Sequence, residues 1–318
     1  MKHKNIFSCV ALLLAASCFT ACSNKSQKVI FSSNWQEDNT VQQNDLVETL
    51  EYDVTFEKGS PIFTDYSIDY TNGKYVTSLK TEQIDGKTVY AYETTLTIDV
   101  IYQTGADIEQ LQDRVYSLVK FEKADKSLRP ISSHKEMYSH SPTNGATESN
   151  QCYELFHYSV DISYDENYAG SFTFKNLEND KEETNSFAMN AEKYTCLDNE
   201  QLLFALRGLN PSLSSSVKFN IYNPYVKGTQ LVNVSFSSED GLDFNFQRNG
   251  VATKGTIQYY PVSIVLDAKN SGATQTAWIA KSTNIQSNTY RNVILKLVTP
   301  LSYHIGSLVY TLKSATFN

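Results

Sequence analysis

The stretch YSIDYTNGKYVTSLKTEQIDGKTVYAYETTLTIDVIY, residues 66–102, decides the fold that this sequence predicts. Apolar and polar side chains alternate along most of it, and tyrosine, threonine and valine predominate, which is the pattern of half-buried β-strands. Asn-Gly at 72–73 and Asp-Gly at 85–86 interrupt the alternation and are typical of tight hairpin turns. We therefore expect a meander of three strands over residues 66–70, 74–81 and 88–102.

The same alternation continues to the C-terminus and predicts about fourteen strands in all. The further strands are expected over residues 116–123, 131–138, 152–161, 170–175, 217–222, 231–236, 242–247, 256–268, 274–280, 292–298 and 308–317. The acidic segment at 176–185 is interpreted as a hairpin tip, because charged runs at turns are usually solvated. Since no linker interrupts the pattern, the sequence predicts one mainly β domain over residues 45–318, built as a single large antiparallel sheet or barrel.

Two segments break the alternation and predict short helices. In CLDNEQLLFALRGLNP, Asp198 is placed as an N-cap with Gln201 three residues later, and Gly208 and Pro211 follow as stop signals. The segment GADIEQLQDRV at 105–115 is a weaker helix candidate. The first helix carries an apolar stripe that must be buried, and the concave face of the sheet is the large apolar surface available to it. The helix is expected to lie there as a permanent plug or as an exchangeable lid; its stripe consists of Leu202, Leu203, Leu206 and Leu209.

The N-terminus has the parts of an export signal: a basic start, an apolar core over 10–16 that is too short to span a bilayer, and small residues after it. Phe19-Thr20-Ala21-Cys22 resembles the lipobox of bacterial lipoproteins, with Phe19 in a place where that family usually has leucine. This resemblance implies a signal peptide over 1–21, a lipid such as palmitate on Cys22 and a polar tether over 22–44. Cleavage before Cys18 and an ordinary secretory signal are the alternatives. A lipoprotein would be held in the bacterial cell envelope by its N-terminal lipid, facing away from the cytoplasm.

Charge excludes nucleic acid as a partner. The whole chain has 27 basic and 35 acidic residues, and removal of Lys2 and Lys4 with the signal increases the acidic excess. The mature part has no basic cluster that would dock on anionic lipid, so the predicted membrane contact is the anchor alone.

Two cysteines, Cys152 and Cys196, remain in the exported part once Cys9, Cys18 and Cys22 are assigned to the signal and the anchor. Outside the cytoplasm these two thiols could form a disulfide, which would close a loop of roughly 45 residues and add on the order of 4 kcal/mol in the chain-entropy model. They could equally stay reduced and buried, because spacing does not determine geometry.

Motifs for catalysis are absent from the sequence. It has no Gly-x-Ser-x-Gly elbow and no His-Glu-x-x-His helix, and the Ser-x-x-Lys at 215–218 runs into a predicted strand without its companion motifs. His134 and His140 share a strand face with Glu136, but closed zinc sites favour tighter spacing, so we interpret the histidines as exposed. Two acidic groups lack the spacing of a calcium loop; they are Asp161, Asp165 and Glu166, and Glu239, Asp240 and Asp243. We expect no enzyme activity, metal or cofactor.

Exposed aromatic rings are the remaining candidates for a site. Tyr222 and Tyr225 flank Pro224 at a predicted strand end and are expected to form an exposed ligand rim. Trp278 lies in the middle of a strand and is expected to be packed, whereas Trp35 lies in the predicted tether.

The order of elements resembles a large family of exported bacterial proteins of unknown function. The resemblance covers about 51–318 and rests on QLLFALRGL at 201–209, NIYNP at 220–224, YYPVSIVLDAK at 259–269, Trp278 with 292–314, and VYSLVKFEKADKSLRPISSHKE at 115–136. It implies a strongly curved antiparallel sheet or half-barrel, similar in shape to lipoprotein carriers, with one or two short helices in its concave face. It implies no catalytic residues.

The leading hypothesis is therefore a lipid-anchored, non-enzymatic envelope protein that binds an apolar or amphipathic ligand, or an envelope partner, at a concave groove. A hydrolase of cell-wall material and a purely structural envelope protein are the alternatives.

Overall fold

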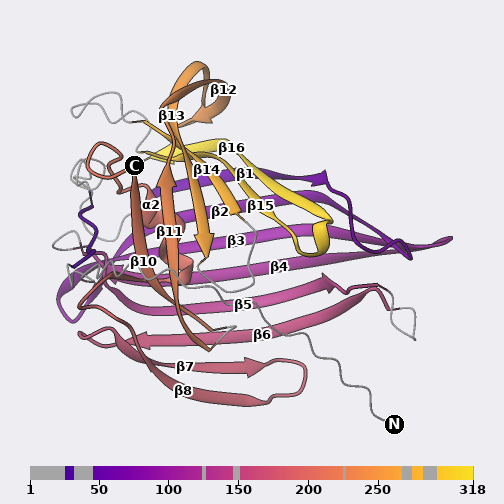
Figure 1. Cartoon of the computed structure of the whole chain (residues 1–318), viewed down its shortest axis with the longest axis horizontal. Coiled ribbons are helices and arrows are strands. Elements are labelled where there is room, and N and C mark those ends of the chain that lie inside the picture. The colour runs from indigo at the N-terminus through magenta and orange to yellow at the C-terminus, as the bar shows by residue number, and fades with distance from the viewer. Residues whose placement is uncertain are drawn as a thin grey trace, which may run out of the picture.

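The computed structural model describes residues 26–31, 46–123, 127–145, 151–224, 227–266, 274–281 and 292–317 of the 318-residue chain. Strands dominate them (Figure 1). The strands are β1 (Leu46–Lys58), β2 (Ser67–Ile84), β3 (Lys87–Thr104), β4 (Asp107–Glu122), β5 (Pro130–Pro142), β6 (Tyr153–Tyr164), β7 (Ala169–Asn176), β8 (Glu182–Ala188), β9 (Thr195–Asp198), β10 (Ser216–Asn223), β11 (Gly228–Phe236), β12 (Asp240–Arg248), β13 (Val251–Leu266), β14 (Thr274–Ala280), β15 (Ile294–Pro300) and β16 (Gly306–Phe317). The helical elements are the 3-10 turns η2 (Asn199–Gln201) and η3 (Ser302–His304) and the helix α2 (Leu202–Leu206).

All sixteen strands belong to one sheet, which confirms the predicted fold class. The order along it is β8-β7-β6-β5-β4-β3-β2-β1-β16-β15-β14-β13-β11-β10-β9, with β12 paired to β13 and touching β16. Neighbours on this path are antiparallel except β9 and β10, which are parallel. In Figure 1 the strands β10, β11 and β14 run across the middle strands of the sheet, so the sheet curves back over itself as an incomplete barrel.

The two margins of the curved sheet meet side chain to side chain. Phe187 of β8 stacks on Tyr222 of β10 with ring centroids 3.8 Å apart, and Lys227 forms an ion pair with Glu183. A second hydrophobic cluster fills the space between β6, β7, β9 and β10, beside the main core. These contacts hold the margins together without a continuous ladder between them.

The two turns predicted in the meander, at 72–73 and 85–86, form different structures. Asp85-Gly86 is the predicted hairpin turn between β2 and β3, with φ of 51° and 75°. Asn72-Gly73 does not end a strand: β2 continues through it, and the register against β3 shifts between Thr71 and Lys74. A β-carbon on Gly73 would lie 2.5 Å from the Val54 carbonyl oxygen, so the close approach of β1 requires glycine here. The prediction of a turn at 72–73 was wrong, and the pair forms a β-bulge, which bends a strand.

The second predicted helix was also wrong. Residues 107–115 belong to β4, which pairs with β3 on one side and β5 on the other. Ile108, Leu111 and Val115 have helical spacing, but pairing with β3 along the whole segment outweighs this local preference, and β5 joins from Arg114 onward. The acidic segment predicted as a tip contains the turn at 177–181, and its end belongs to the edge strand β8.

The capped helix forms where it was predicted and is deeply buried. Asp198 and Gln201 make the expected capping box, and the chain passes through η2 into α2. Phe204 is fully buried and its ring lies 5.3 Å from Tyr92 and 4.9 Å from Phe121 across the sheet. Of the predicted stripe, Leu203 is only partly buried. The contacts are those of a plug.

The described part of the predicted tether is not free of the domain. Residues 26–31 lie against the domain: Gln27 forms a parallel bridge with Tyr194, and Phe31 is 2% exposed and stacks on Phe219. Val29 and Phe31 explain this docking, because Phe31 is buried in the main core and Val29 packs against it, whereas Ile30 is exposed. Cys22 and Trp35 lie outside the described residues. Among the described residues, no helix is both long and apolar enough to cross a membrane.

Candidate functional site

The inner face of β3, β4 and β5 is divided along the strands into three zones. The first zone lies under the helix, where Tyr90, Tyr92 and Phe121 surround Phe204. Strand residues two apart point to the same face. Thr94 and Leu96, two and four positions after Tyr92 on β3, therefore belong to the second and third zones.

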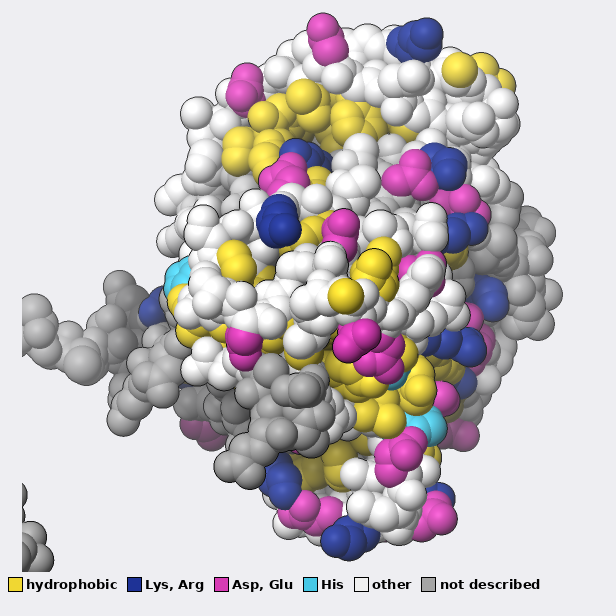
Figure 2. Space-filling view, turned by 90° about the vertical axis from the view of Figure 1, so that its right-hand side faces the viewer, with side chains coloured by type: hydrophobic (Ala, Val, Ile, Leu, Met, Phe, Trp, Pro, Cys, Tyr) yellow, Lys and Arg dark blue, Asp and Glu magenta, His cyan; other side chains and the backbone are white. Residues whose placement is uncertain are grey.

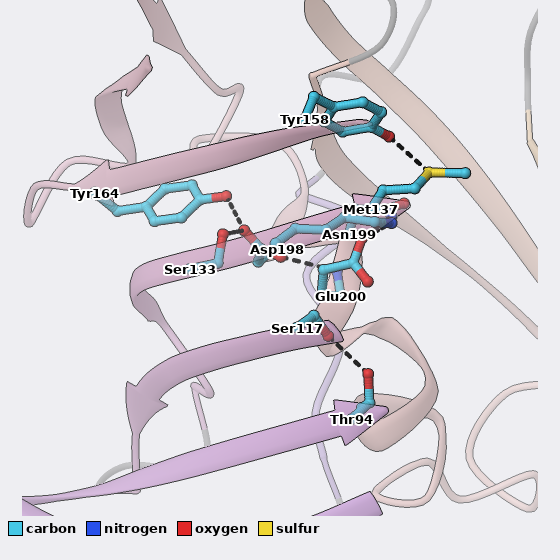
Figure 3. Close-up of polar contacts among 10 residues, drawn as sticks. Thr94, Ser117, Ser133, Met137, Tyr158, Tyr164, Asp198, Asn199 and Glu200 are labelled. Carbon is cyan, nitrogen blue, oxygen red and sulfur yellow. Dashed lines mark hydrogen bonds and ion pairs between the residues drawn. The ribbon is translucent and has the colours of Figure 1, made fainter. Parts of the chain in front are cut away.

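The second zone is a polar row formed by Thr94, Ser117, Lys135 and Glu200, of which Figure 3 labels Thr94, Ser117 and Glu200. Thr94 pairs with Ser117 in the ladder and Ser117 with Lys135, so three strands contribute to the row in register. The hydroxyls of Thr94 and Ser117 share a hydrogen bond of 2.8 Å, and Lys135 Nζ donates to Glu200 Oε1 at 2.8 Å. Burial acts to raise the pKa of the Glu200 carboxyl, but the charge and hydrogen bond of Lys135 outweigh it and lower that pKa.

Asp198 lies beside this row, at the start of η2, and is 1% exposed. Ser133 Oγ donates to its Oδ2 at 2.6 Å and Tyr164 donates to the same oxygen at 2.5 Å (Figure 3). Burial raises the pKa of the Asp198 carboxyl, although these two hydrogen bonds oppose the shift. The network fixes the helix start to β5 and β6 and separates the plugged end of the barrel from the rest.

The third zone is an open groove of about 580 Å³ at the far end of the same strands. Its apolar lining comes from both layers and includes Leu96, Ile98, Val115, Met137, Phe156 and Leu308. Its polar lining includes Asp113, Ser139, His140 and Glu154. Figure 2 shows this end of the molecule, where hydrophobic side chains gather beside acidic and histidine side chains.

Asp113 organises one wall of the open groove, at the point where the β4–β5 ladder ends. The last paired residues are Arg114 and Tyr138, and beyond them the Asp113 carboxylate accepts from the His140 amide at 2.8 Å. Ser139 Oγ donates to the other carboxylate oxygen at 2.7 Å, and His140 Nδ1 lies 2.8 Å from Oδ1. Since a carboxylate only accepts, Nδ1 carries the hydrogen. The serine therefore bonds to the aspartate rather than to the histidine, which is not the order of a Ser-His-Asp relay.

The opposite wall is the connection from β15 to β16. Tyr303 and His304 both have left-handed backbone conformations, with φ of 56° and 58°. Gly59 packs against this connection: its amide donates to the Ile305 carbonyl at 2.8 Å, and a β-carbon there would lie 2.4 Å from the His304 carbonyl oxygen. Left-handed non-glycine residues are costly and persist only where their surroundings fix them. The wall is therefore a fixed one.

A larger hollow of about 930 Å³ lies at the opposite end of the molecule, around the β2–β3 turn. Charged side chains are prominent in its lining, and Arg129 is already paired there with Glu122 at 2.5 Å and with the Asp165 carbonyl at 3.1 Å. These pairs are satisfied within the protein, so the open groove is the stronger candidate for a ligand.

Tyr222, the described residue of the predicted aromatic rim, is buried. Tyr222 is 1% exposed, because closure of the barrel places it against Phe187 and Phe172. The interpretation of Tyr222 as a rim residue was wrong, and Tyr225 lies outside the described residues. Trp278 is partly buried against the main core, as expected.

Cys152 and Cys196 are not joined by a disulfide, so the reduced alternative is the one that the structure has. Cys152 Sγ lies 3.0 Å from Thr104 Oγ1 in the main core, whereas Cys196 belongs to the second cluster. Burial raises the pKa of the Cys196 thiol to about 12.

The histidines do not form a metal site. Each has a carboxylate neighbour of its own: His134 with Asp161 at 2.8 Å, and His140 with Asp113. Six strand residues separate these two rings by about 20 Å, too far to share an ion. His140 is buried, which corrects the prediction that it is exposed. Within the described part of the chain, no group of three metal-binding side chains comes together.

Sequence reasoning missed the polar row and the Asp113 cluster. The available signal was a polar residue at an inward position of an alternating strand, as at Asp113, Ser117 and Thr94. An inward position can be recognised only if the segment is known to be a strand. The interpretation of 105–115 as a helix therefore hid the inward position of Asp113.

No protein-family model matches the chain, and a search of curated proteins finds no match. Among solved structures, the chain is similar to a β-barrel-like protein from Brucella abortus, a domain of unknown function named DUF1849. The TM-score is 0.51 at 10% sequence identity, over 86% of this chain and 98% of that one. At this identity the likeness shows a shared β-barrel-like fold, which confirms the fold implied by the resemblance to curved-sheet proteins of unknown function.

Proposed function

We propose that this chain is a non-enzymatic protein of the bacterial cell envelope that binds an amphipathic ligand in the open groove. The observation that carries the proposal is the open groove of about 580 Å³ on the inner face of β3–β5, beyond the part of that face that α2 covers. That volume is in the range of small-molecule pockets, which are typically apolar with a few polar groups. The lining of Leu96, Val115 and Met137 with Asp113 and Ser139 has this composition.

The groove is tested by displacement of a neutral fluorescent probe, N-phenyl-1-naphthylamine. Val115→Trp places a large ring inside the groove and should abolish probe binding. Val251→Trp is the matched control, because Val251 is an exposed strand valine outside the groove. Circular dichroism confirms that each variant is folded, and Met137→Trp replaces Val115→Trp if the latter is not.

Absence of probe binding in the wild type would remove the ligand-binding proposal and favour a purely structural role. A second readout addresses the hydrolase alternative: release of soluble fragments from purified cell wall by the wild type, lost in Asp113→Asn, would contradict the non-enzymatic part.

The membrane contact in this proposal is a lipid on Cys22, supported by the lipobox resemblance of residues 19–22. Cys22→Ala should abolish fatty-acid labelling in cells and release the protein from the membrane fraction. Cys18→Ala is the matched control and should leave labelling intact. Loss of labelling in Cys18→Ala instead would assign the anchor to the other cysteine.

A further inference from the structure

The residues that line the open groove include two acidic side chains, Asp113 and Glu154, and no lysine or arginine. The protein as a whole has 27 basic residues, so the absence of any from this lining gives the groove a one-sided charge.

The nearest basic side chains are directed elsewhere or already paired. Lys58 ends β1 and Arg114 lies on β4; both are exposed and neither lines the groove. Lys135 lies in the polar row, and its Nζ is paired with Glu200 Oε1 at 2.8 Å. Among the described residues of the lining, an anionic group in the groove would therefore meet carboxylates and no lysine or arginine.

Glu154 is the charged side chain best placed to meet a ligand. It lies at the start of β6, is exposed, and lines the groove. Asp113 lies deeper in the same wall, where it is buried and its carboxyl oxygens contact Ser139 and His140. The carboxylates thus face the mouth and one wall, while the floor of Leu96, Val115 and Met137 is apolar.

We propose that the open groove selects single-chain amphiphiles with a positively charged ammonium headgroup. The alkyl chain lies on the apolar floor, where its burial is favourable, and the ammonium group lies at the mouth beside Glu154. Opposite charges a few ångströms apart attract, whereas a carboxylate or phosphate headgroup would be repelled at the same place. This inference rests on the proposed function, because it names the ligand class of the same groove.

The test compares two amphiphiles with the same chain length as competitors of N-phenyl-1-naphthylamine at pH 7, below their micelle concentrations. Dodecyltrimethylammonium should displace the probe at about three- to tenfold lower concentration than dodecanoate, the size expected for a solvent-exposed charge pair. The preference should shrink as salt rises from 0.02 M to 0.5 M, because exposed charges are screened.

Glu154→Gln should reduce the preference and Glu154→Lys should reverse it, with each competitor measured against the affinity of the same variant for the probe. Glu136→Gln is the matched control: Glu136 is an exposed glutamate of β5 that does not line the groove, and its loss should leave the preference intact. Because Glu154 is exposed, these substitutions leave the core untouched.

The outcomes separate the two proposals. Probe binding that is lost in Val115→Trp, combined with equal or stronger competition by dodecanoate, would overturn the ammonium selectivity and leave the groove proposal standing. No probe binding at all would overturn the groove proposal itself.

Discussion

The two halves of β3 and β4 carry similar inward side chains, yet the protein completes them in different ways. Tyr92 and Phe121 are covered by Phe204 of α2, whereas Leu96 and Val115, a few positions along the same strands, line an open groove. Between the halves lies the polar row. The comparison shows that strand chemistry alone does not decide whether an inner face becomes core or binding surface; a returning chain segment decides it.

The largest expected effect contrasts one phenylalanine from each half. Phe204→Ala should lower the free energy of unfolding by about 3 to 5 kcal/mol, because it opens a cavity around a fully buried ring. Phe156→Ala, at a half-buried groove position, should cost about 1 kcal/mol, since less surface is lost from the core. Urea denaturation measures both. Equal losses would mean that the groove half is packed as tightly as the plugged half.

The next effect concerns the polar group that holds the groove wall. Asp113→Asn should cost about 1 to 3 kcal/mol, because the amide cannot accept all the hydrogen bonds from Ser139 and His140. Asp107→Asn, an exposed position on the same strand, should be nearly neutral. If thermal melts show the same stability for both variants, the wall does not depend on the Asp113 carboxylate.

These residues also show how far sequence reasoning reached. Alternation predicted most strands because most strands have one buried face, but β1, β8 and β9 were not predicted. Asp198 and Gln201 located the helix because capping is local. Tyr222 was misplaced because its burial depends on Phe187, 35 positions earlier in the chain and brought near only by barrel closure. Asn72-Gly73 was misread because the same dipeptide serves a turn and a bulge, and the approach of Val54 from β1 decides between them.

The groove could not have been located from sequence for the same reason. Its two walls come from β4–β6 and from the β15–β16 connection, and neither carries a catalytic or metal-binding motif. Its charge could not be located either, because its two carboxylates, Asp113 and Glu154, lie on different strands that only the fold brings to one groove.

A smaller effect should appear in the pH dependence of the boundary between the halves. Burial raises the pKa of Asp198 in the folded state, so the folded protein holds this proton more tightly than the unfolded chain does. Its contribution to stability is present below the unfolded pKa of about 3.9 and is lost as pH rises through the higher folded pKa. Relative to Asp198→Asn, the wild type should therefore become less stable as pH increases from 3.5 to 7, which urea denaturation at several pH values measures.

Glu200, two residues from Asp198, should make stability depend on pH in the opposite direction. Lys135 helps to lower its folded pKa, so its contribution is present above the unfolded pKa and is lost as pH falls through the folded value. Relative to Glu200→Gln, the wild type should become less stable on acidification. Opposite slopes for the two variants in urea titrations would support the assignment, and parallel slopes would contradict it.

The smallest expected effect concerns the two thiols, one at the groove end of the barrel and one near the plug. Cys152 lies beside Thr104 at the groove end of the long strands, and Cys196 lies on β9, just before the capping box of the plug. Because they belong to separate clusters, reductant should leave the melting temperature unchanged, and the denatured, unreduced domain should show two free thiols. In the native state Cys152 should react with a thiol reagent before Cys196, since burial raises the pKa of Cys196 to about 12 and the plugged end should open less often. Single Cys→Ser variants assign the two phases, and faster reaction of Cys196 would show that the plugged end opens first.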